Sequence, residues 1–135
     1  MTKPIVLIVE EDALIRMSAV HMVEDAGYTV VEACNADEAI GILERQSDIR
    51  LVFTDINMSG SMDGLKLAHA IRNRWPPIHL IVASGLNMQD KLPAKGRFVR
   101  KPYTPEDITA ALDELLGHSP APSMNENGCG SAKVA

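Results

Sequence analysis

The sequence predicts an α/β protein built on a parallel sheet. Short runs of β-branched residues and leucine alternate with segments whose apolar residues fall at helical spacing, and this alternation occurs five times along the chain. Right-handed crossovers between the strands would place helices on both faces of the sheet. The chain has 135 residues, of which 46% are hydrophobic and 23% charged, as is usual for one globular domain.

The first half of the chain contains two predicted strands, each followed by a helix. Residues 5–9, IVLIV, are apolar on both faces, which is typical of a central parallel strand. Apolar residues at helical spacing follow over residues 15–26, and Gly27 ends that helix. Residues 28–33, YTVVEA, form a less apolar strand, expected nearer an edge. The next helix, over residues 35–43, opens on a capping-box pattern of asparagine and glutamate.

The second half contains three more predicted strands. Residues 51–54, LVFT, form the third strand, and the helix over residues 64–74 ends before a pair of prolines. Residues 79–84, HLIVAS, and residues 97–99, RFV, form the fourth and fifth strands. The last helix, over residues 104–115, opens on a threonine cap followed by proline.

Composition sets the domain boundary and the expected location. We expect one folded domain over residues 1–117 and a disordered tail over residues 118–135, which are rich in proline, glycine, serine and asparagine. The net charge of −5 argues against binding to nucleic acid, and no apolar run reaches the ~18–20 residues of a membrane span. Cys34 and Cys129 show no metal or redox spacing. Without a secretory signal pattern, these features predict a cytoplasmic protein that binds neither nucleic acid nor membrane.

Polar residues collect where the predicted strands end. In an open parallel sheet, ligands bind beyond the carboxyl ends of the strands, so these residues would share one edge. They are Glu10, Glu11 and Asp12 after the first strand, Asp55 and Asn57 after the third, Ser84 and Gly85 after the fourth, and Lys101 and Pro102 after the fifth.

The chemistry of this edge indicates a site for a cation and a phosphoryl group. Three acids directly after an apolar strand repel one another unless a cation lies among them. A hard cation such as Mg²⁺ takes few carboxylates, keeps several waters and commonly bridges to phosphate oxygens. Asp55 beside that cation is a candidate nucleophile toward a phosphoryl group. Lys101 would neutralise one phosphoryl oxygen, and the Ser84 hydroxyl would donate to another.

Five segments, in their order and spacing, resemble the receiver domain of two-component response regulators. They are VLIVEEDALIR, LVFTDINM, DGLKLA, IVASG and FVRKPY, and the resemblance covers Lys3 to about Leu116. It implies a flavodoxin-like, doubly wound sheet of five parallel strands in the order 2-1-3-4-5. It also implies a stand-alone phosphoacceptor module that takes a phosphoryl group from a sensor histidine kinase or a histidine phosphotransfer protein and signals to an unknown downstream protein. Such a module is not an enzyme, because it catalyses only its own phosphorylation and dephosphorylation.

The resemblance also assigns roles to individual residues. Asp55 would be the phosphoacceptor, and Lys101 and Ser84 would contact the phosphoryl group. Mg²⁺ or another divalent cation would be held by Glu10, acting through water, Glu11, Asp55 and the backbone carbonyl of Asn57. Ser84 and the aromatic Phe98 would form the switch that reports phosphorylation. The bond between Lys101 and Pro102 is commonly a cis peptide in the family.

Three departures from the family pattern bear on this site. Glu11 stands where the family usually has aspartate, and its extra methylene moves the carboxylate by about one C–C bond. Ser59 stands where proline is frequent. The segment between Ser84 and Lys101 is short and contains Pro93 and glycines, so we expect the fourth helix to be short, irregular or partly melted.

Other function classes fit the residues less well. A phosphatase of the haloacid-dehalogenase type needs a second aspartate two residues after the nucleophile, where this chain has Asn57. A flavin-binding module needs a hydroxyl-rich loop after the first strand, where Glu10, Glu11 and Asp12 would repel the flavin phosphate. A degenerate receiver that binds partners without phosphorylation stays open because of Glu11.

Overall fold

A five-stranded parallel sheet forms the centre of the protein. The structure is a computed structural model and describes residues 4–117. The strands are β1 (Ile5–Val9), β2 (Thr29–Ala33), β3 (Ile49–Asp55), β4 (His79–Ser84) and β5 (Arg97–Arg100). The helices are α1 (Ala13–Asp25), α2 (Ala36–Arg45), α3 (Gly64–Arg74) and α4 (Pro105–Leu116), with one 3₁₀ turn, η1 (Gln89–Lys91). The expected tail at residues 118–135, with Cys129, lies outside the described residues.

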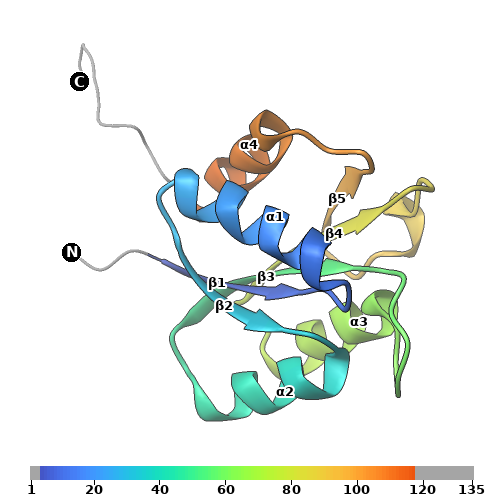
Figure 1. Cartoon of the computed structure of the whole chain (residues 1–135). Coiled ribbons are helices and arrows are strands. Elements are labelled where there is room, and N and C mark those ends of the chain that lie inside the picture. Colours follow the sequence, from blue (N-terminus) through green and yellow to red (C-terminus); the bar gives the residue numbers. More distant parts are fainter. Residues whose placement is uncertain (1–3, 118–135) are drawn as a thin grey trace.

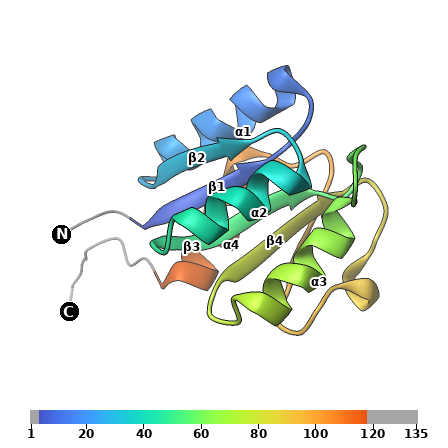
Figure 2. The ribbon, with the colours of Figure 1, turned by 90° about the horizontal axis from the view of Figure 1, so that it is seen from below.

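The strand order β2-β1-β3-β4-β5 and the wholly parallel pairing confirm the predicted flavodoxin-like fold. Helices α1 and α4 cover one face of the sheet, and α2 and α3 cover the other (Figure 1; Figure 2 shows α2 and α3 from below). Each face has its own hydrophobic cluster, and the alternating side chains of β1 and β3 supply both. The core therefore lies in two layers, one on each side of the sheet.

The sheet register brings the strand ends to one edge. Val9 pairs with Thr54, and Asp55 pairs with Ala83, so β1, β3 and β4 end almost level. Ser84 pairs with Arg100, which places Lys101 directly beyond the end of β5. The polar residues that follow these strands therefore share one edge of the sheet, as the sequence predicts.

The beginning of α1 differs from expectation. Ile15 was expected on the buried stripe of this helix, but its side chain is 42% exposed, and Leu14 is 76% exposed. The residues across from them, Pro102 and Tyr103, leave an open groove of about 600 Å³ instead of filling the space. The buried residues of α1 begin only at Ala19, one turn further on.

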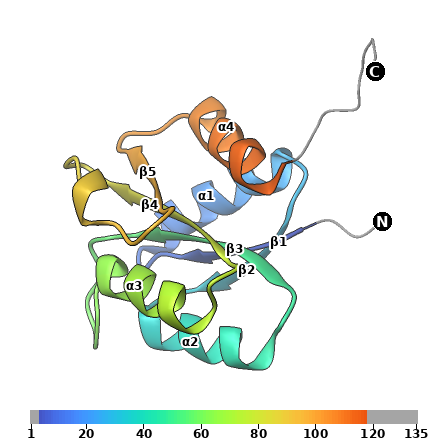
Figure 3. The same cartoon turned by 180° about the vertical axis from the view of Figure 1, so that it is seen from behind.

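The segment between β4 and β5 is short and irregular, as predicted. Its only helical residues are those of η1, and Figure 3 shows them as one turn near α3. Two side chains of α3 hold this segment by its backbone. His69 Nε2 lies 2.8 Å from the carbonyl oxygen of Lys91, and Arg72 Nε donates to the carbonyl oxygen of Ala94 at 2.8 Å. Tertiary contacts therefore replace the hydrogen bonds of a full helix here.

Candidate functional site

The candidate site lies at the carboxyl ends of four strands. Glu10 directly follows β1, Asp55 is the last residue of β3, Ser84 is the last residue of β4, and Lys101 directly follows β5. Glu10, Asp55 and Ser84 are all buried, with 6%, 8% and 4% of their surfaces exposed. Fixed strands thus hold these polar groups at the edge of an apolar core.

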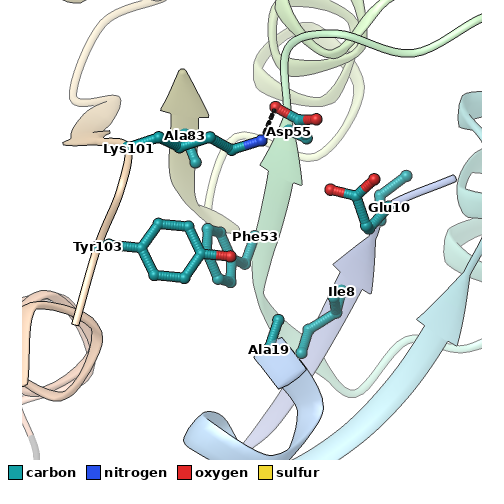
Figure 4. Close-up of a pocket in the computed structure, with 9 residues that line it drawn as sticks. Ile8, Glu10, Ala19, Phe53, Asp55, Ala83, Lys101 and Tyr103 are labelled. Carbon is teal, nitrogen blue, oxygen red and sulfur yellow. Dashed lines mark ion pairs between the residues drawn. The ribbon is translucent and has the colours of Figure 1, made fainter. Parts of the chain in front are cut away.

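Asp55 and Lys101 form the central contact of the site. The Lys101 ammonium nitrogen lies 2.9 Å from Asp55 Oδ1, and Figure 4 shows both side chains reaching toward each other across the end of β4. Oδ1 is buried and, among the described residues, has no partner that meets hydrogen-bond geometry. The contact is therefore an ion pair between the ammonium and the carboxylate. A carboxylate oxygen has more than one acceptor site, so Oδ1 can accept a further ligand beside this ion pair.

Glu10 shares the pocket with Asp55. Its Oε2 accepts a hydrogen bond from the backbone N–H of Asp12 at 3.0 Å, and Arg16 donates to its backbone carbonyl at 2.7 Å. Burial raises the pKa of Glu10 above its ordinary value, and the negative charge of Asp55 adds to that rise. The Asp12 N–H and the Lys101 charge oppose it without reversing it. Two acids near each other with one lysine leave excess negative charge at this edge.

Glu11 lies outside the pocket. Its side chain is exposed, and Oε1 accepts two hydrogen bonds from Ser59, from the backbone N–H at 2.9 Å and from the hydroxyl at 2.7 Å. These two bonds lower the pKa of Glu11. Asn57, whose carbonyl is expected to bind the metal, is an exposed residue of the loop between β3 and α3 that also contains Ser59. Within residues 4–117, no three histidine, cysteine, aspartate or glutamate side chains are grouped as a metal ion would need.

The site nevertheless suits a hard cation. The Asp55 and Glu10 carboxylates are neighbouring oxygen donors, and the single Lys101 ammonium faces both of them. Oxygen donors are the ligands that Mg²⁺ takes, and this ion needs only one or two carboxylates with waters completing its shell. The donors present therefore fit the expected ion without a preformed cage of three acids.

The two candidate switch residues lie on neighbouring strands. Ser84 Oγ accepts a hydrogen bond from the backbone N–H of Leu86 at 3.2 Å. Phe98 pairs with Val82 in the sheet and is only half-buried. In the described part of the chain, Phe98 packs into neither hydrophobic cluster. The peptide bond between Lys101 and Pro102 is cis, in agreement with the family pattern.

Gly64 fixes how α3 approaches the end of β3. A Cβ atom at this position would overlap the Asp55 carbonyl oxygen and lie 2.7 Å from the Asp55 carbonyl carbon and 2.9 Å from Ile56 Cα. The Gly64 N–H donates to the Ile56 carbonyl at 2.9 Å. Only glycine allows the first residue of α3 to lie against the backbone of Asp55. The DG pair at the start of this helix is the sequence signal for this contact.

Tyr103 is a site residue that the sequence reasoning missed. Its ring meets the ring of Phe53 edge-on, with centroids 5.6 Å apart, and both side chains line the pocket with Glu10, Asp55 and Lys101 (Figure 4). Burial raises the pKa of Tyr103 to about 12, and the charges of Glu10 and Asp55 contribute. The only sequence signal is its place two residues after Lys101, since no local pattern predicts an inward ring.

The doubly wound sheet, with buried acids, a serine and a lysine at its carboxyl edge, has the architecture expected of a two-component signalling module. The chain belongs to the response regulator receiver domain family, whose model matches residues 6–113. Within residues 4–117, none of the helices has both the length and the apolar character needed to span a membrane.

Similar proteins include sensors and regulators of bacterial signalling. The chain is 32% identical over 117 residues to the sensor kinase CckA of Brucella abortus, covering 82% of this chain and 12% of that protein. It is 31% identical over 123 residues to the aerobic respiration control protein ArcA of Escherichia coli K12, covering 88% of this chain and 51% of ArcA. The crystal structure of the receiver domain from the hybrid histidine kinase CckA superposes with a TM-score of 0.72 at 26% identity, covering 83% and 98% of the two chains. The chain thus spans about half the length of ArcA and a much smaller share of CckA.

Proposed function

We propose that this chain is the phosphoacceptor module of a two-component phosphorelay. It takes a phosphoryl group onto Asp55 from a sensor histidine kinase or a histidine phosphotransfer protein, and it then switches a face that binds a downstream protein. One observation carries the proposal: the buried Asp55 at the end of β3 lies 2.9 Å from the Lys101 ammonium, at the sheet edge where β1 and β4 also end. The proposal keeps the cytoplasmic location expected from the sequence, and the module acts on no other substrate.

The transfer makes one bond and breaks another. An Asp55 carboxylate oxygen attacks the phosphorus of phosphohistidine, the P–N bond breaks, and the imidazole nitrogen leaves with the electron pair. The Lys101 ammonium offsets charge on the phosphoryl oxygens, which lowers the cost of bringing an anion to a carboxylate. Burial at the end of β3 fixes the direction in which Asp55 faces the donor.

A divalent cation would complete the site. Asp55, Glu10 through water, Glu11 and the Asn57 carbonyl are the groups proposed to hold Mg²⁺. When bound, Mg²⁺ supplies positive charge that screens the phosphoryl oxygens from the acids. Glu11 has to leave Ser59 to take part, because Oε1 is engaged there.

Ser84 and Phe98 form the proposed switch. The Ser84 hydroxyl, which accepts the N–H of Leu86, would turn to donate its own hydrogen to a phosphoryl oxygen. The half-buried Phe98 ring would then move into the space that Ser84 vacates. Only a small energy difference between two such states is needed for a switch.

The exposed apolar start of α1 suits docking of the phosphodonor. Leu14, Ile15 and Met22 line an open groove with Pro102 and Tyr103, and Tyr103 also lines the pocket of Asp55. A donor protein has to bring its phosphohistidine to Asp55, so its surface must contact the residues beside that pocket. Clusters of exposed apolar residues of this kind mark protein interaction sites.

The proposal is tested by incubation with acetyl phosphate and Mg²⁺, followed by intact mass measurement and peptide mapping. The parent chain should gain one phosphate on Asp55, and Asp55→Asn should gain none. Asp63→Asn is the matched control, because Asp63 caps α3 through the Lys66 N–H and should not accept phosphate. Phosphate mapped to any other residue of the intact protein would contradict the proposal.

A second candidate function, a receiver that binds partners without phosphorylation, is favoured by the position of Glu11. That carboxylate is bound to Ser59 and stays outside the pocket. Under this alternative, the mass experiment shows no phosphate on the parent chain at any Mg²⁺ concentration. A partner would then bind the parent and Asp55→Asn with equal affinity.

A further inference from the structure

The contact between Glu11 and Ser59 joins two loops that frame the site. Glu11 lies between β1 and α1, and Ser59 lies 48 residues later, between β3 and α3. A single oxygen, Oε1, accepts both the N–H of Ser59 at 2.9 Å and its hydroxyl at 2.7 Å. Hydrogen bonds to a carboxylate are shorter and stronger than those between neutral groups, and 2.7 Å lies in that range.

The same loop has a second, independent contact of the same kind. The Ser61 hydroxyl donates to Asp37 Oδ1 at 2.6 Å, which ties the loop to α2. Gly60 between the two serines has a φ of 104°, a left-handed conformation that lets neighbouring side chains point to different partners. The loop is thus attached on one side to Glu11 and on the other to α2, and only the first attachment involves a residue of the site.

We propose that Ser59 is a positioning residue that holds Glu11 outside the pocket in the metal-free protein, so that Glu11 becomes a ligand of a divalent cation only by breaking this contact. The inference rests on the proposed function, since it assumes that the edge around Asp55 binds Mg²⁺. Both departures from the family pattern contribute. The longer side chain of Glu11 reaches the loop, and Ser59 supplies a hydroxyl and an N–H that proline does not have.

The consequence is a weakened cation site. In the described residues, no three acids are grouped around one point, although Glu10, Glu11 and Asp55 all belong to this edge. Mg²⁺ tolerates little departure from octahedral geometry. It therefore either gains Glu11 as a direct ligand, which breaks the contact with Ser59, or fills that coordination position with water. Recruiting Glu11 costs two hydrogen bonds to a charged group, and this cost appears as a lower affinity.

The test is Mg²⁺ titration of the full chain without any phosphodonor, followed by amide NMR and calorimetry. Ser59→Ala removes the hydroxyl bond and keeps the N–H bond, so Mg²⁺ affinity should rise roughly threefold to tenfold. In the parent chain, the Ser59 amide should lose protection from exchange as Mg²⁺ binds. Ser61→Ala is the matched control, because it removes a hydroxyl–carboxylate bond of the same loop at Asp37 and should leave Mg²⁺ affinity unchanged.

Two results would overturn the inference, and they differ from failure of the cation site itself. If Ser59→Ala binds Mg²⁺ more weakly, Ser59 supports Glu11 as a ligand and does not withhold it. If its affinity matches the parent while Mg²⁺ still shifts the amides of Glu10 and Asp55, the contact has no influence on the ion. If no variant shows Mg²⁺-dependent shifts at those two amides, the proposed cation site fails, and this inference fails with it.

Discussion

Two neighbouring glutamates at the end of β1 have opposite electrostatic environments. Burial raises the pKa of Glu10, and two hydrogen bonds from Ser59 lower the pKa of Glu11. Glu10 binds its proton more tightly in the folded state than in the unfolded state, so ionisation at neutral pH works against folding. Glu11 ionises more readily when folded, so its charge favours the folded state. The site therefore holds a carboxylate at a cost to stability.

This contrast predicts how stability depends on pH. A raised pKa contributes stability that is complete below the unfolded pKa, near 4.5, and is lost as pH rises through the folded pKa. Glu10→Gln keeps an acceptor for the Asp12 N–H and removes the charge, so it should be more stable than the parent at pH 7. The gain should shrink toward pH 4. Urea unfolding at several pH values checks this.

Glu11→Gln is the control with the opposite sign. The lowered pKa of Glu11 means that its contribution is present above pH 4.5 and is lost as pH falls through the folded pKa. Glu11→Gln should therefore lose stability relative to the parent at neutral pH, with the difference vanishing in acid. Equal pH profiles for the two variants would contradict the assignment of separate environments to these glutamates.

Gly64 is a second residue on which the site geometry depends. Gly64→Ala places a methyl group against the backbone of Asp55 and Ile56, which cannot yield as a side chain can. We expect a loss of about 2–3 kcal/mol in unfolding free energy and slower uptake of phosphate from acetyl phosphate, because Asp55 is displaced. Chemical denaturation and the labelling rate measure the two effects.

Gly41→Ala provides the comparison for Gly64→Ala. Gly41 lies inside α2, and a Cβ there meets only the end of the Arg45 side chain, at 3.2 Å. Alanine should raise stability by up to about 1 kcal/mol through its higher helix propensity and leave labelling unchanged. If both alanine variants behaved alike, close packing against Asp55 would not explain the role of Gly64.

At the scale of elements, the segment between β4 and β5 depends on α3. Arg72 Nε donates to the Ala94 carbonyl at 2.8 Å, and its Nη1 donates to the carbonyls of Pro76 and Ile78 at 2.7 and 2.9 Å. Few backbone hydrogen bonds hold the segment itself, with those of η1 and the Gly96 N–H to the Pro93 carbonyl the main ones. Such a segment opens locally at a low free-energy cost.

Amide exchange should therefore be fast over residues 86–96 and slow in β1. Arg72→Met should speed exchange in this segment further and lower unfolding free energy by about 2–3 kcal/mol, because three carbonyls lose a charged donor. Arg74→Met is the control. It breaks an exposed pair with Glu44 and should cost less than about 1 kcal/mol. Protection of residues 86–96 equal to that of β1 would contradict the low opening cost expected of this segment.

The same segment should respond to phosphorylation. Binding of Mg²⁺ with a phosphoryl mimic should slow exchange over residues 86–96, because Ser84 would exchange its contact with the Leu86 N–H for one with the phosphoryl group. Ser84→Ala should reduce that slowing. Hydrogen exchange followed by mass spectrometry, with and without ligand, measures both effects, and an identical response in Ser84→Ala would exclude the hydroxyl as the trigger.

For the whole molecule, the groove beside α1 predicts how the donor recognises the chain. Ile15→Asp places a charge in the apolar groove and should reduce phosphotransfer from a histidine kinase that labels the parent by about tenfold or more. Labelling by acetyl phosphate should not change, since that small donor needs no docking surface. Ala110→Asp, at an exposed position of α4 outside the groove, should leave both reactions intact. Loss of both reactions in Ile15→Asp would indicate damage to the fold.

The sequence alone determined the sheet, its helices and the edge at which the candidate site lies. Hydrophobic periodicity is local, so β1 and the helix caps at Asn35 and Thr104 follow from their own residues. The short connection before β5 was also predictable, because Pro93 and the glycines exclude a full helix there. Parallel strands end at a common edge, so the sequence also predicted that four polar residues share that edge: Glu10, Asp55, Ser84 and Lys101.

Only the tertiary structure decided which contacts those residues make. Glu11 binds Ser59 across 48 residues, Tyr103 packs on Phe53, and Ile15 faces an open groove. Each outcome depends on how far a loop extends and which way a side chain turns, and neither is encoded in a local pattern. Periodicity indicates which face of an element is apolar, but whether that face is covered depends on residues from other parts of the chain.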